Sequence, residues 1–137
     1  MDATPRTAAG APWTRDLQYS QTVRTGDLVF TAGQGGFNAD GELVSGGFEA
    51  QLRQTLANLA DVLRVQGANL DTVVKLTVYL TDVADYDTFR SLRSTFLSPP
   101  YPASTAIAVK ALLVEGMRVE IDAVAVAGLR RQALPDD

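Results

Sequence analysis

The fold is decided by residues 48–81, which read FEAQLRQTLANLADVLRVQGANLDTVVKLTVYLT. The first half predicts a helix over 48–65 that ends near Gly67, because leucines recur at steps of four, three and four: Leu52, Leu56, Leu59 and Leu63. The second half alternates between two faces over 72–81, which predicts a strand with one apolar side made of Val74, Leu76, Val78 and Leu80. A helix with one apolar stripe followed by such a strand predicts packing of the helix on a sheet.

Four further short strands are expected on either side of this stretch, over 17–24, 27–32, 105–112 and 118–127. Thr25-Gly26 would join the first two in a tight turn. The segment 33–43, GQGGFNADGEL, holds four glycines and is expected to be a loop.

A second helix is expected over 86–97, with an apolar stripe made of Tyr86, Phe89, Leu92 and Phe96. Asp85 can cap its start and Pro99-Pro100 stops it. The order of elements becomes ββαβαββ, which predicts an α+β fold with two helices on one face of a sheet of five or more strands.

The second face of this sheet is too apolar to be left in water. The run 123–127 is apolar on both sides, and so is much of 73–80. We therefore expect this face to pack against other subunits. The alternative is a sheet half covered by its own loops.

The composition narrows the possible chemistry. The 137 residues contain neither cysteine nor histidine, so thiolate or imidazole catalysis and His or Cys metal sites are excluded. The net charge of −4 disfavours a nucleic acid partner. No basic leader or apolar run of membrane length is visible, so we expect a cytoplasmic protein with no membrane partner. A single domain is expected over 15–128, between a flexible segment 1–14 and a tail 129–137.

The pattern R-V-E-I-D near the C-terminus carries the clearest candidate chemistry. It is expected to place Arg118, Glu120 and Asp122 on one face of a strand. If that face meets another subunit, burial would raise the pKa of Glu120 and suit it to proton transfer. A solvated face or an ion pair with Arg118 is the alternative. Tyr19 and Tyr79 could donate hydrogen bonds, although an aromatic residue in a strand is more often part of the core.

Six segments in register resemble the reactive intermediate deaminase (RidA/YjgF) family over most of the chain. They are Tyr19-Ser20-Gln21 followed by 26–30 (GDLVF), Ala32-Gly33-Gln34, 51–63 (QLRQTLANLADVL), 73–82 (VVKLTVYLTD), Pro102-Ala103 and 119–123 (VEIDA). The resemblance implies a chorismate-mutase-like fold, about six strands with two helices on one face, and a homotrimer with ligand clefts between subunits. It also implies hydrolysis of reactive enamines and imines without a cofactor or metal. Tyr19 matches a cleft tyrosine, and Glu120 matches the carboxylate that positions the hydrolytic water.

The sequence departs from the family pattern where an arginine usually grips the substrate carboxylate. The usual Pro-Ala-Arg-Ser reads Pro102-Ala103-Ser104-Thr105 here, and a hydroxyl cannot supply a bidentate charged grip. The serine that usually precedes Gly-Gln is Ala32, and a helix position that is often Asn is Arg90. Arg90 could reach the cleft in place of the missing arginine, or it could simply face solvent. The predicted substrate-binding set is therefore Tyr19, Ala32, Gly33, Arg90, Ser104, Thr105 and Ala106.

These observations favour a small-molecule hydrolase or deaminase that uses Glu120, acting on an enamine, an imine or a related carbonyl compound. Because Ser104 replaces arginine, the usual activity on 2-imino acids is expected to be weakened or redirected. The alternative is a non-catalytic trimer that binds a metabolite or a partner through the same clefts. Ribonuclease activity, a name attached to some relatives, ranks last because of the negative charge and the absence of histidine.

Overall fold

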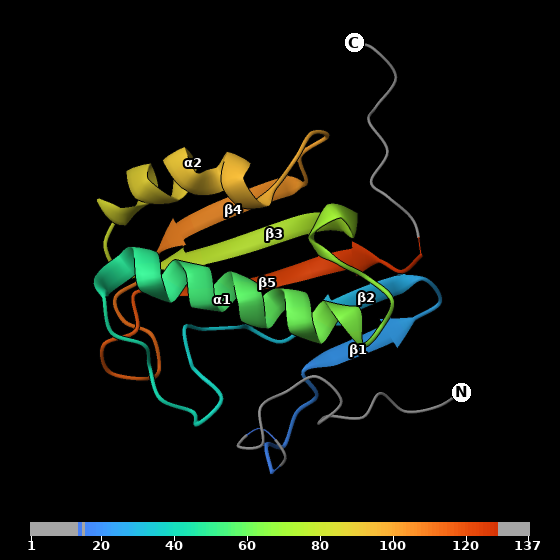
Figure 1. Cartoon of the computed structure of the whole chain (residues 1–137), viewed down its shortest axis with the longest axis horizontal. Coiled ribbons are helices and arrows are strands. Elements are labelled where there is room, and N and C mark those ends of the chain that lie inside the picture. The colour runs from blue at the N-terminus through green and yellow to red at the C-terminus, as the bar shows by residue number, and fades with distance from the viewer. Residues whose placement is uncertain (1–13, 15, 129–137) are drawn as a thin grey trace.

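The computed structural model describes residues 14 and 16–128, which form a five-stranded mixed sheet and two helices (Figure 1). The elements are β1 (Thr22–Thr25), β2 (Leu28–Thr31), α1 (Gly47–Arg64), the short 3-10 helix η2 (Leu70–Thr72), β3 (Val73–Leu80), α2 (Asp85–Phe96), β4 (Ala103–Ala108) and β5 (Val119–Val126). This order confirms the α+β class and the ββαβαββ arrangement. Apart from Thr14, which is buried, the predicted terminal segments 1–14 and 129–137 lie outside the described residues.

The strands lie in the order β1-β2-β5-β3-β4. β3 and β4 are parallel and are joined by a crossover through α2, whereas the other neighbouring pairs are antiparallel. β1 and β2 form a hairpin whose turn includes Gly26 with a φ of 57°, a conformation that favours glycine. The described sheet thus has five strands, compared with the expectation of about six, and β4 forms one of its edges.

The apolar stripe predicted for the first helix is confirmed. Its four leucines are buried against the sheet, and α1 lies across β5 and β2 while α2 packs beside it (Figure 1). The inward side of the sheet contributes Val29, Leu76, Val78, Leu80, Val119, Ile121, Ala123 and Ala125 to this core. The core therefore lies between the helices and one face of the sheet.

The predicted alternation of the third strand is wrong at its first residues. Val73 pairs with Ala125 and Lys75 pairs with Val124, so Val74 is an extra residue in a β-bulge. The bulge brings Val73 into the core, where it is fully buried, while Val74 is only partly buried. From Leu76 onward the predicted apolar side is correct.

Two predicted strands are displaced because a strand continues only where a partner strand is available. The first begins at Thr22, which pairs with the last residue of β2, rather than at residue 17. The fourth covers 103–108 instead of 105–112, because its register on β3 runs from Lys75 to Leu80.

The second face of the sheet carries a mixture of polar and apolar side chains. Apolar side chains on it are substantially exposed in the single chain, with 43% for Leu28, 42% for Phe30 and 44% for Ile107. The expectation that this face packs against other subunits stays a prediction, and the exposed apolar side chains are consistent with it.

No helix in the described part of the chain combines the length and the apolarity that crossing a bilayer requires. The cytoplasmic location expected from the sequence stays a prediction.

Candidate active site

A cavity of about 560 Å³ lies where the glycine-rich loop passes beside the first half of β5. It brings together three of the predicted site residues, Tyr19, Gly33 and Glu120. The other side chains that line it include Gln21, Gln34, Phe37, Asn38, Gln54, Asn58, Asp61, Leu113, Val114 and Met117. The described lining residues thus combine amide and carboxylate side chains with a few apolar ones.

The glycine-rich loop continues the sheet beside β5. The backbone N–H of Gln34 donates to the carbonyl of Ile121 at 2.8 Å, and the N–H of Ile121 donates to the carbonyl of Gln34 at 3.0 Å. The buried Gln34 amide also donates to the side-chain oxygen of Gln21 at 2.8 Å. The loop is therefore fixed against β5 on one side and against the segment before β1 on the other.

Helix α1 holds the same loop from the opposite side. The Asn58 amide donates to the carbonyls of Gly35 at 2.9 Å and Phe37 at 2.8 Å, and Gln54 donates to Asn58 at 2.9 Å. Sequence analysis missed this role. A signal was present, because Gln51, Gln54, Asn58 and Asp61 recur at steps of three, four and three beside the leucine stripe.

Glu120 is the candidate catalytic residue that lines the cavity. It faces the side of β5 away from the core, it is half-buried, and its carboxylate packs directly on Gly33. A Cβ at position 33 would lie 2.5 Å from Oε2, so only glycine leaves this space to the carboxylate. Burial, and secondarily the negative charge of Asp122, raise the pKa of Glu120 above its ordinary value. A raised pKa makes this carboxylate a stronger base than an ordinary glutamate, which suits it to accept and return a proton.

Asp122 and Tyr79 extend the polar row on the same face. The Tyr79 hydroxyl donates to Oδ2 of Asp122 at 2.9 Å, and Tyr79 is the cross-strand neighbour of Glu120. The hydrogen bond to Asp122 is the main cause that raises the pKa of Tyr79, followed by burial and by the charges of Asp122 and Glu120. Tyr79 is therefore a donor that holds Asp122, and it stays protonated beside Glu120.

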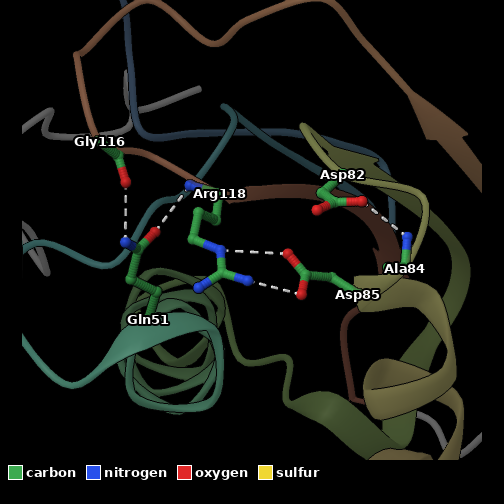
Figure 2. Close-up of polar contacts among 6 residues, drawn as sticks. All are labelled: Gln51, Asp82, Ala84, Asp85, Gly116 and Arg118. Atoms are coloured by element: carbon green, nitrogen blue, oxygen red, sulfur yellow. Dashed lines mark hydrogen bonds and ion pairs between the residues drawn. The ribbon is translucent and has the colours of Figure 1, made fainter.

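The prediction that Arg118 shares a face with Glu120 and Asp122 is wrong. Arg118 precedes β5, and its guanidinium turns toward the helices, where Nε and Nη2 donate to the Asp85 carboxylate at 3.1 and 2.7 Å (Figure 2). The reason is that strand alternation holds only within the paired strand, which starts at Val119.

The prediction that Asp85 caps the second helix is also wrong. Asp85 is the first residue of α2, the N-cap is Ala84, and no side chain caps it by hydrogen bonding. Instead, Asp82 accepts a hydrogen bond from the backbone N–H of Ala84 at 2.9 Å (Figure 2). The carboxylate of Asp85 is thereby left for its ion pair with Arg118.

The remaining predicted residues do not line the cavity of a single chain. Ser104 and Ala106 pair with Leu76 and Val78 on β3, so they point to the helix side of the exposed edge strand. Thr105 points to the other face, where its hydroxyl accepts a hydrogen bond from Lys75 at 2.5 Å.

Arg90 and Ala32 also lie apart from the cavity lining. Arg90 is exposed on α2 and forms an ion pair with Asp87 at 3.4 Å. Ala32 is partly buried, and its N–H donates to the carbonyl of Gln21 at 2.9 Å.

The described part of the chain contains no group of three or more Asp, Glu, His or Cys residues that could hold a metal ion. The chemistry that this arrangement can perform with its own groups is proton transfer by Glu120 in a partly dehydrated cavity.

A mixed sheet with two helices, and a carboxylate packed on a glycine-rich loop, define an α+β protein with a candidate site for a small molecule. The chain belongs to the family described as Endoribonuclease L-PSP, whose model matches residues 11–127, and this is the RidA/YjgF family that the sequence motifs resemble.

Relatives and solved structures agree with this assignment. The chain is 39% identical over 111 residues to a mouse protein named 2-iminobutanoate/2-iminopropanoate deaminase, which covers 80% of this chain and 82% of the relative. It is 42% identical over 107 residues to a RutC family protein of Sinorhizobium fredii, and the match covers 77% of this chain and 84% of that protein. The crystal structure of RidA from an Antarctic Psychrobacter has a TM-score of 0.81 and 35% identity, covering 91% of this chain and 99% of that one.

Proposed function

We propose that this protein hydrolyses reactive enamines, imines or related carbonyl compounds at clefts between the subunits of a homotrimer. The observation that carries the proposal is Glu120, a half-buried carboxylate with a raised pKa that is packed on Gly33 inside the cavity. The mouse relative is named as an imine deaminase, which supports the same class of reaction.

The reaction needs only an oriented water and a proton carrier. The imine carbon is electrophilic, so a water oxygen adds to it while Glu120 accepts a proton from that water. Glu120 then returns that proton to the nitrogen, which gives a carbinolamine. Glu120 next carries the proton of the carbinolamine hydroxyl to the same nitrogen, so that the C–N bond breaks, the carbonyl forms and ammonia leaves. One imine and one water thus yield one carbonyl compound and one ammonia. Tyr19, which is 54% exposed at the cavity, is in place to donate a hydrogen bond to the substrate.

Two observations support an assembly of several chains. The second sheet face exposes Leu28, Phe30 and Ile107, which a partner would remove from water. The predicted binding residues also fall into two groups, one at the cavity and one on β4 and α2. A cleft formed between chains could combine the cavity of one with the edge strand of another.

The charges at the site argue against strong selection of 2-imino acids. Among the described residues that line the cavity, the charged ones are Asp61 and Glu120, and both are acidic. The β4 edge offers the neutral Ser104 where an arginine would grip a carboxylate. This supports substrates whose polar group is not a carboxylate. The same observation is what favours the alternative function, a non-catalytic trimer that binds a metabolite or a partner.

The two functions are separated by measuring keto-acid or aldehyde formation from imines generated in the assay by an amine or amino acid oxidase. Acceleration by wild type and its loss, by about tenfold or more, in Glu120→Ala would support hydrolysis. Arg53→Gln, a change in an exposed ion pair on α1, serves as the control. Equal rates with and without protein, both for the imines made by an amine oxidase and for the imino acids made by an amino acid oxidase, would leave only the binding function.

We do not propose the nuclease activity in the family's description. The chain has a net charge of −4, which disfavours RNA binding, and it lacks histidine, so no imidazole is available for acid–base cleavage.

A further inference from the structure

Arg118, two residues before Glu120 in the sequence, connects the start of β5 with α1 and α2. Two of its guanidinium nitrogens, Nε and Nη2, donate to the two carboxylate oxygens of Asp85 on α2 (Figure 2). Its guanidinium carbon lies 5.8 Å from the ring centre of Phe48 on α1. A bidentate pair of this kind fixes direction as well as distance. The side chain therefore ties the start of β5 to the first turns of both helices.

Gln51 holds the backbone at the same place. Its amide nitrogen donates to the carbonyl of Gly116 at 2.9 Å, and its amide oxygen accepts from the N–H of Arg118 at 2.8 Å (Figure 2). Gln51 is 5% exposed, so water cannot replace these bonds without opening the core. Met117, between the two held residues, is buried and lines the cavity.

Asp85 is itself held in one position. Its N–H donates to the carbonyl of Asp82 at 3.0 Å, while the Asp82 carboxylate accepts from the N–H of Ala84 at 2.9 Å. The Asp85 side chain is 10% exposed, whereas the Arg118 side chain is 41% exposed. The acceptor is thus the rigid partner, and it orients the more exposed arginine.

Glu120 follows the anchored Arg118 by two positions and is the second residue of β5. Its side chain points to the opposite face, where it must remain against Gly33 to stay partly dehydrated. The space for it is narrow, since Cδ would lie only 2.8 Å from a Cβ on Gly33. A small shift of the start of β5 would therefore change how much water reaches the carboxylate.

We propose that Arg118 is a positioning residue for Glu120: paired with Asp85 and held by Gln51, it fixes the start of β5 so that the Glu120 carboxylate stays packed on Gly33. The consequence for catalysis rests on the proposed function, whereas the consequence for the position of Glu120 does not. Arg118 acts through Glu120 and is not itself among the described residues that line the cavity.

The test compares Arg118→Gln with Arg118→Lys, Asp85→Asn and the control Arg53→Gln, which alters an exposed ion pair on α1. The titration of the Glu120 carboxyl carbon is followed by NMR in each protein, and kcat and KM are measured on an imine that the wild type hydrolyses. The other ionisable groups near Glu120 remain in every variant: Asp122 on the same strand, Tyr79 on β3, and Tyr19 and Asp61 at the cavity.

We expect the pKa of Glu120 to fall toward its ordinary value in Arg118→Gln and Asp85→Asn, because the loosened carboxylate gains water. We expect kcat to fall about tenfold with KM within about twofold, which is a loss of about 1.4 kcal/mol in the transition state. Arg118→Lys keeps the charge and one donor, so it should restore part of both readouts. Arg53→Gln should match the wild type.

An unchanged Glu120 titration in folded Arg118→Gln and Asp85→Asn would overturn the proposal. Should Arg118→Gln fail to fold, Asp85→Asn decides, since it removes the same pair with little change of volume. A wild type that hydrolyses no imine would refute the proposed function, while the titration would still decide whether Arg118 positions Glu120.

Discussion

The carboxylate of Glu120 occupies the space that a side chain at Gly33 would need, since a Cβ there would lie 2.5 Å from Oε2. The two residues come from segments far apart in the sequence, the glycine-rich loop and β5. Their contact is set by the paired hydrogen bonds between Gln34 and Ile121. The position of the candidate catalytic group thus depends on a residue that has no side chain.

Replacing Gly33 by alanine should therefore damage the site more than the fold. The new methyl group must push the flexible end of Glu120 away, so we expect kcat to fall about tenfold or more while the melting temperature drops by only a few degrees. Gly35→Ala is the matched comparison, because its Cβ would meet Met117 Cε at 2.7 Å instead. Equal kcat for wild type and Gly33→Ala would show that the contact is not needed.

Asp122→Asn should move the acid limb of the pH–rate profile to lower pH. The negative charge of Asp122 helps to raise the pKa of Glu120, so removing it lets Glu120 ionise at lower pH. The measurement is kcat/KM from about pH 4 to pH 8, the range in which a perturbed carboxyl group titrates. Asp61→Asn is the control, because Asp61 lines the same cavity but is paired with Arg64. A shift to higher pH in Asp122→Asn would contradict the assignment.

Glu120→Gln should lose activity and gain stability at pH 7. Burial raises the folded-state pKa of Glu120 above its ordinary value of 4.5, so the ionised form opposes folding at neutral pH. The penalty disappears as pH falls below that ordinary value, where both states are protonated. Because the side chain is only half-buried, we expect a gain of about 0.5 kcal/mol at pH 7.

Denaturant unfolding of Glu120→Gln and wild type at pH 7 and at pH 3.5 measures this difference. The gain should be present at the higher pH and absent at the lower one. A variant that is less stable than wild type at pH 7 would mean that the ionised carboxylate stabilises the fold.

Local periodicity was enough to predict the elements that depend on one chain segment. The stripe from Leu52 to Leu63 predicted α1 to within one residue at each end. This is possible because the apolar face of an amphipathic helix follows from the spacing of residues within that one segment. The alternation of β3 failed at Val73 because a bulge depends on the register with β5, which no single segment contains.

The candidate site shows the same division. Glu120 could be predicted from its place in a strand and from the family resemblance. The contacts that hold it could not, because Arg118 and Asp85 are 33 residues apart and Gln51 reaches Gly116 from another helix. Their pairing depends on how α1 and α2 pack. From the sequence alone, an aspartate at the start of a predicted helix is more commonly an N-cap, so that role was predicted for Asp85.

The central claim is that the second face of the sheet is buried between copies of this chain, so that the cavity around Glu120 is completed by a neighbour. Sedimentation velocity at low micromolar concentration tests it directly, with Phe30→Glu as the variant that places a charge on the apolar part of that face. We predict that the wild type sediments at about three times the 14.6 kDa of one chain and that Phe30→Glu dissociates. A wild type that sediments as a single chain while hydrolysing imines at full rate would contradict the account.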